Sequence, residues 1–167
     1  ARDGVVELAS GLQYRVLRAG AGASHPTADS KCSCHYEGRL IDGTKFDSSY
    51  DRGSPTTFAP NQVIKGWTEA MQLMVEGDKW EMYIPSELGY GDSGQGADIG
   101  PGDVLVFTME ILKINGASVP AERGPPGFDE LATTEQFAAW AGAARGGGGA
   151  LVLGLFRRPT VGDLFAT

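Results

Sequence analysis

"VIKGWTEAMQ", residues 63–72, has the spacing of a short amphipathic helix. Apolar residues recur in this region at i, i+3, i+4 and i+7, which places them on one helix face: Trp67, Ala70, Met71 and Met74. A tryptophan is costly to bury unless its N–H group finds a partner. At the end of a short helix, a tryptophan ring can also form the floor of a pocket. Trp67 is therefore a core residue or a pocket residue, and the rest of the chain must decide between the two.

The segments around this helix have the two-residue period of half-buried strands. We expect strands at residues 11–20, 31–40, 78–85 and 104–114, and a short irregular strand at 45–53. The sequence Asp-Gly-Thr at 42–44 predicts a hairpin turn. The chain therefore indicates an α+β fold, in which an antiparallel β-sheet wraps one short α-helix.

A long loop and a change in composition complete the outline. Residues 86–103 contain six glycines, and a loop of this length inside a compact domain is usually functional. We divide the chain into an N-terminal leader, a folded domain, a Gly/Pro-rich linker and a helix–strand tail, at 1–9, 10–115, 116–127 and 128–167.

The composition excludes several classes of partner. The chain of 167 residues is 41% hydrophobic and 21% charged, which is ordinary for a globular protein. Its net charge of −7 argues against nucleic acid and anionic membranes, because both favour a basic patch. No apolar run approaches the roughly 18 residues of a membrane span, so we expect no membrane insertion. The chain begins at Ala1, which we interpret as a processed form or an excised fragment.

The two cysteines raise the question of a metal site. Cys32 and Cys34 lie two residues apart on an expected strand, so both face the same side. A disulfide between them would need strained geometry, and we interpret them as free, buried thiols. The alternative is a metal site that includes His35, but His35 would point to the opposite face of the strand. We therefore expect no metal ion.

Several motifs occur together in one order over residues 10–114. They are "SGLQYRVL", "HYEGRLIDGTKFDSS", "VIKGWTEAMQLMVEGDKWEMYIPSELGYG" and "LVFTMEIL". This set resembles the FKBP-type peptidyl-prolyl cis-trans isomerases, and more narrowly their macrophage infectivity potentiator-like branch. The resemblance implies a hydrophobic pocket between the sheet and the helix, with Trp67 as the floor under a proline ring.

The resemblance also implies roles for individual residues. Asp47, Tyr36, Tyr90 and Phe107 are the implied catalytic residues. The implied substrate-binding residues are Tyr36, Phe46, Asp47, Arg52, Val63, Ile64, Trp67, Tyr90, Ile99 and Phe107. Rotation about the bond before proline breaks no covalent bond, so we expect no cofactor.

The function implied is catalysis of Xaa-Pro isomerisation during the folding of proline-containing polypeptides. The alternative is a module that binds proline motifs, as a chaperone or scaffold, with little catalytic role. Four positions depart from the best-known members at the pocket rim: Thr56, Gln62, Gln95 and Asp98. We therefore expect macrolides such as tacrolimus or rapamycin to bind with reduced affinity.

The tail has a resemblance of its own. "LATTEQFAAWAGAARGGGGALVLGLF", residues 131–156, resembles the start of a non-catalytic thioredoxin-like domain of protein disulfide isomerases. The tail contains no C-x-x-C motif, which argues against redox catalysis. About forty residues cannot bury a full core of this kind, so we expect the chain to continue or the tail to dock on something. The resemblance favours the secretory pathway or an organelle lumen, endoplasmic reticulum or thylakoid, over the cytoplasm.

Overall fold

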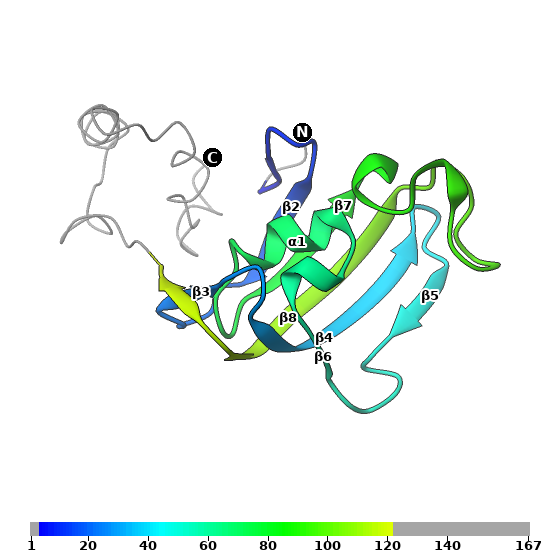
Figure 1. The fold of residues 1–167 in the computed structure, drawn as a ribbon. Coiled ribbons are helices and arrows are strands. Elements are labelled where there is room, and N and C mark those ends of the chain that lie inside the picture. The colour runs from blue at the N-terminus through cyan, green and yellow to red at the C-terminus, as the bar shows by residue number, and fades with distance from the viewer. Residues whose placement is uncertain (1–3, 122–167) are drawn as a thin grey trace. The chain divides into compact units, whose positions relative to one another are not determined.

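The computed structural model describes residues 4–121. Nine strands, one α-helix and three short 3-10 helices make up this part of the chain (Figure 1). In chain order they are β1 (Val6–Glu7), β2 (Gln13–Arg18), β3 (Ser24–Pro26), β4 (Lys31–Leu40), β5 (Lys45–Ser48), β6 (Thr56–Phe58), η1 (Pro60–Gln62), α1 (Lys65–Met71), β7 (Lys79–Ile84), η2 (Ser86–Leu88), η3 (Gly91–Ser93), β8 (Leu105–Asn115) and β9 (Ser118–Pro120).

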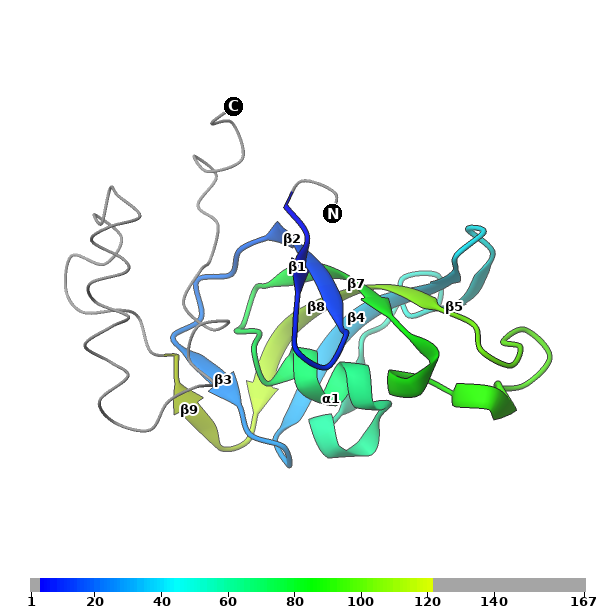
Figure 2. The same ribbon diagram turned by 90° about the horizontal axis from the view of Figure 1, so that it is seen from above.

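Seven of the strands form one antiparallel sheet that supports the helix. The strand order is β1-β2-β7-β8-β4-β5, and β6 pairs with β4. Both views show α1 against one face of this sheet (Figures 1 and 2). The predicted α+β fold, an antiparallel sheet with one short α-helix, is therefore confirmed.

The contact between helix and sheet is close because a glycine lies at it. A Cβ atom added to Gly66 of α1 would lie 2.8 Å from Cγ2 of Ile84 on β7, a distance that real Cβ atoms do not adopt. The four residues expected on one helix face are all buried: Trp67, Ala70, Met71 and Met74. The helical period in this stretch thus marks the face that packs on the sheet.

The strands bury the residues that their alternation predicted. On β4, Cys32, Cys34 and Tyr36 face the core, and the side chain of His35 lies on the other face, stacked on Tyr50 with ring centroids 4.6 Å apart. Both cysteines are free and buried, as expected. Burial also raises the pKa of the Cys32 thiol to about 11, which keeps it protonated at neutral pH.

Two stretches that we placed outside the domain contribute strands to it. Residues 6–7, expected in a loose leader, form β1 and pair with β2. Residues 118–120, expected in a linker, form β9 and pair with β3. Both strands have only two or three residues, which is too short for a hydrophobic period to appear in the sequence. The expected linker beyond residue 121 and the tail of 128–167 lie outside the described residues.

The long loop between β7 and β8 is ordered by its own backbone. Two hydrogen bonds join Gln95 and Ile99: the Gln95 N–H donates to the Ile99 carbonyl at 2.8 Å, and the reverse bond measures 3.2 Å. Gly94 precedes this bridge with a φ of 64°, a left-handed conformation that favours glycine. The glycines of this stretch therefore shape a defined loop tip.

Residues 4–121 contain no helix that is long and apolar enough to span a membrane.

Candidate functional site

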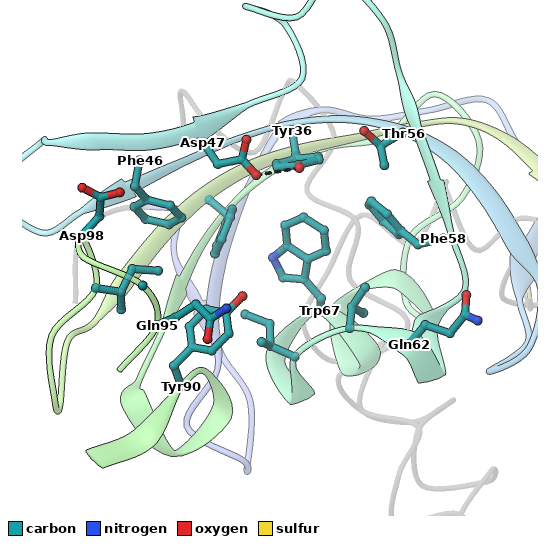
Figure 3. A pocket seen from close by; sticks show the side chains of 15 residues that line it. Tyr36, Phe46, Asp47, Thr56, Phe58, Gln62, Trp67, Tyr90, Gln95 and Asp98 are labelled. Atoms are coloured by element: carbon teal, nitrogen blue, oxygen red, sulfur yellow. Dashed lines mark hydrogen bonds between the residues drawn. The ribbon is translucent and has the colours of Figure 1, made fainter. Parts of the chain in front are cut away.

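A cavity of about 480 Å³ opens between α1, the sheet and the long loop (Figure 3). Its wall combines a ring of aromatic and aliphatic side chains with a few polar ones at the rim. The lining residues are Tyr36, Phe46, Asp47, Thr56, Phe58, Gln62, Val63, Ile64, Trp67, Tyr90, Gln95, Gly96, Asp98, Ile99 and Phe107. The volume is in the range of small-ligand sites.

Trp67 forms the floor of this cavity. Its side chain enters from α1 and is only 6% exposed. Two aromatic rings stand nearly perpendicular to the indole: that of Tyr36 at 5.0 Å and 71°, and that of Phe107 at 4.8 Å and 80°. The ring of Phe58 lies 5.1 Å away. Trp67 is thus both core and cavity, which resolves the choice that its sequence left open.

Gly38 has no side chain, and two aromatic rings of the cavity wall fill the space beside it. This residue lies on β4, opposite Phe107 on β8 and Asp47 on β5. A Cβ atom at Gly38 would lie 2.6 Å from ring atoms of both Phe107 and Phe46. The two rings contact each other edge to face, with centroids 5.5 Å apart. The arrangement of these walls therefore requires glycine at this position.

A polar network lies at the edge of the aromatic wall. The Tyr36 hydroxyl donates to Oδ2 of Asp47 at 2.7 Å, and Nη2 of Arg52 donates to the Tyr36 oxygen at 2.9 Å. Nη1 of Arg52 also forms an ion pair with Oδ1 of Asp47. The Arg52 guanidinium lies over the Tyr36 ring, 5.5 Å from its centroid. These contacts fix the Tyr36 ring in the wall of the cavity.

The same contacts set the charge of Asp47. Burial alone would raise the pKa of Asp47. The hydrogen bonds from Tyr36 and Arg52, together with the positive charge of Arg52, lower it by more, so the pKa of Asp47 lies below its usual range. Burial and the bond to Asp47 raise the pKa of Tyr36. At neutral pH the network therefore contains an ionised carboxylate, a neutral phenol and a guanidinium.

Three residues that line the cavity have donors with no partner within residues 4–121. The indole Nε1 of Trp67 is buried and unpaired. The Ile64 backbone N–H, at the N-cap of α1, and the Tyr90 hydroxyl donate no hydrogen bond to any described residue. The Ile64 and Tyr90 residues are only partly buried, so a ligand carbonyl can accept a hydrogen bond from either donor. The cavity is therefore suited to an apolar ring whose neighbouring atoms are hydrogen-bond acceptors.

The structure brings the residues implied by the resemblance together. All of the ten implied substrate-binding residues line the cavity except Arg52, which contacts it through Tyr36 and Asp47. The four departures, Thr56, Gln62, Gln95 and Asp98, line it as well. The roles of these residues remain predictions.

Sequence reasoning missed Phe58, Gly96 and the supporting Gly38. Phe58 lies on the short strand β6, which pairs with β4 so that Phe58 is opposite Cys32. The sequence predicts no strand here, because three residues are too few to show a strand period. The only signal was an aromatic residue in a polar loop segment.

Residues 4–121 contain no group of three or more His, Cys, Asp or Glu side chains that could hold a metal ion.

Comparisons with known proteins agree with this geometry. Residues 22–112 match the family model described as FKBP-type peptidyl-prolyl cis-trans isomerase. A protein of Trypanosoma cruzi named macrophage infectivity potentiator is 53% identical over 114 residues, which cover 68% of this chain and 58% of that protein. A Legionella longbeachae protein named outer membrane protein MIP is 44% identical over 117 residues, covering 70% of this chain and 50% of that protein. The chain thus spans between 50% and 58% of the length of these two curated relatives.

Among solved structures, a peptidyl-prolyl cis-trans isomerase of Pseudomonas syringae pv. tomato superposes with a TM-score of 0.65. It is 40% identical, and the match covers 70% of this chain and 84% of that chain.

Proposed function

Because this chain belongs to the FKBP-type peptidyl-prolyl cis-trans isomerase family, we propose that it catalyses rotation about Xaa-Pro bonds in polypeptides. One observation carries the proposal. The cavity has a tryptophan floor, aromatic walls and unpaired hydrogen-bond donors on the residues that line it. A proline ring with its two flanking carbonyls has the complementary chemistry.

The reaction breaks and forms no covalent bond, so such a site needs no nucleophile or cofactor. The barrier to rotation, roughly 20 kcal/mol, comes from amide resonance, and unaided isomerisation takes tens to hundreds of seconds. A planar amide is more polar than a twisted one. An apolar cavity therefore favours the twisted state relative to the planar one, which lowers the barrier.

Hydrogen bonds to the substrate would add orientation. The Ile64 N–H and the Tyr90 hydroxyl would hold the carbonyls that flank the proline ring over Trp67. The twisted state is favoured if these donors fit its carbonyl positions better than those of the planar state. Tyr36 and Phe107 would enclose the rotating bond.

Asp47 would act by holding Tyr36 and Arg52 in place. Replacing it with alanine should reduce kcat/KM about tenfold or more, as a hundredfold loss can follow from a displacement of about 1 Å. Stability should change by less than about 1 kcal/mol, because its ion pair with Arg52 is exposed. A protease-coupled isomerisation assay on a short Xaa-Pro peptide, together with urea unfolding, measures both effects.

Asp51→Ala is the matched control for this test. Asp51 lies in the turn that follows β5 and pairs with Lys45, but it does not line the cavity. This variant should keep the activity of the parent protein. Full activity in a folded Asp47→Ala protein would remove Asp47 from the site. Binding of proline peptides without turnover in the parent protein would instead support the binding-module alternative.

We also propose that the clients are proline-containing polypeptides in a compartment outside the cytoplasm. A relative named as an outer membrane protein supports this assignment. An endoplasmic reticulum or thylakoid lumen is the narrower form of the proposal, and it rests on the resemblance of the tail.

Macrolides such as tacrolimus and rapamycin are expected to bind the same cavity with reduced affinity. Asp98 puts a carboxylate at the rim, and covering it with an apolar ligand surface carries a desolvation cost. Asp98→Ile should therefore increase the affinity for rapamycin by about 1 kcal/mol, the scale of one apolar contact. Calorimetric titration of both proteins measures this difference. Equal affinities would show that the Asp98 carboxylate lies away from the bound ligand.

A further inference from the structure

The rim of the cavity carries an uncompensated negative charge. Only two of the residues that line the cavity are charged, Asp47 and Asp98. Arg52 offsets the charge of Asp47 through their ion pair. The exposed side chain of Asp98, in contrast, forms no ion pair or hydrogen bond with any residue that the structure describes. Among the described residues that line the cavity, Asp98 is therefore the one charged side chain without an ion-pair partner.

The backbone of an ordered loop places Asp98 at the rim. Asp98 lies within the loop tip closed by the two hydrogen bonds between Gln95 and Ile99. The next side chain, Ile99, is only 7% exposed and is part of the hydrophobic core. Figure 3 shows Asp98 beside Phe46, at the opposite end of the cavity from Gln62. The charge is thus presented at one end of the cavity by an anchored loop.

Any polypeptide bound by its proline must pass this rim. A proline ring on Trp67 fills the floor, and one residue spans only about 3.3 Å of an extended chain. The residues on either side of the proline therefore lie close to the rim of the cavity, and Asp98 stands at one end of that rim.

We infer that Asp98 makes this site selective for polypeptides with Lys or Arg next to proline, and against those with Glu or Asp there. This inference rests on the proposed function and names its substrate class. An exposed ion pair contributes little, so we expect kcat/KM to favour Lys over Leu by about two- to fivefold. Repulsion should disfavour Glu relative to Leu by a similar factor. Both effects should shrink as salt is added, because the carboxylate is exposed to solvent.

The test is a series of short peptides that differ in one residue. One set carries Lys, Leu or Glu immediately before proline, and a second set carries the same residues immediately after it. Wild-type protein and Asp98→Asn are compared at low and high salt. The ratio of kcat/KM for Lys over Glu should be high in wild-type protein and fall toward one in Asp98→Asn. The set that shows the effect identifies which flank of the proline passes Asp98.

Asp92→Asn is the matched control. Asp92 is an exposed acid of the same loop, but it does not line the cavity, so this variant should keep the wild-type ratio. A charge inversion, Asp98→Lys, should reverse the preference.

Three different results would overturn the inference. A ratio near one in both peptide sets, with ready turnover of the Leu peptides, would overturn the selectivity and leave the isomerase proposal intact. If the Lys-over-Glu ratio fell equally in Asp92→Asn and Asp98→Asn, the preference would come from the overall charge of the protein and not from Asp98. No turnover of any peptide would overturn the proposed function, and the inference with it.

Discussion

Trp67→Ala is expected to lower the free energy of unfolding by about 3–5 kcal/mol and to abolish isomerase turnover. Both losses have the same cause. The indole is buried, and the rings of Tyr36 and Phe107 pack against it edge to face. Truncation therefore removes core packing and the floor of the cavity at once. Urea unfolding and the peptide assay, run at a temperature where the variant is folded, measure the two losses separately.

Trp80→Ala separates the two roles. Trp80 on β7 is as buried as Trp67, at 5% exposed, and stacks on Tyr14 with centroids 4.1 Å apart. It does not line the cavity. Its truncation should cost similar stability and leave kcat/KM per folded molecule close to that of the parent protein. Unchanged peptide binding and an unchanged melting temperature in Trp67→Ala would refute the assignment of this residue as the floor.

Gly38→Ala is expected to reduce kcat/KM by about tenfold or more and to cost about 1–3 kcal/mol of stability. A methyl group at Gly38 would overlap the rings of Phe46 and Phe107, at 2.6 Å from each. Neither ring can retreat freely, because each packs edge to face against the other. The cavity would therefore change shape without the loss of any of its lining residues. Comparison of peptide turnover with urea unfolding shows whether function suffers more than stability.

Gly100→Ala is the control for a glycine substitution in the same domain. The nearest atom to a Cβ at Gly100 is an Asp103 oxygen at 3.4 Å, which is an ordinary contact. This variant should behave like the parent protein. If Gly38→Ala is equally active, the rings can move aside without consequence, and Gly38 has no part in shaping the site.

The sequence predicted those parts of the fold that have a long hydrophobic period. The six-residue strand β7, the ten-residue strand β4 and the eleven-residue strand β8 show such alternation, and Trp67 and its neighbours mark the helix. The short strands β1, β3, β6 and β9 were missed. They are ordered by pairing with a neighbouring strand, and two or three residues contain no period.

The sequence could predict those site residues that lie in recognisable motifs. Trp67 and Phe107 lie in motifs with a recognisable order. Phe58 and Gly38 belong to the site only because of where the folded sheet places them. Phe58 reaches the indole only because β6 pairs with β4, and Gly38 matters for the atoms it lacks. No local pattern records either property.

The strand order also determines how this domain can form during its synthesis. The central strand β4 pairs along its length with β8, so that Lys31 lies opposite Asn115. A ribosome must therefore release nearly the whole domain before the middle of the sheet can close. Such long-range pairing makes folding slow, because loop-closure entropy is lost before the contacts are gained. The emerging chain exposes the apolar side of β4 until β8 arrives, and this interval is when it depends most on protection from aggregation.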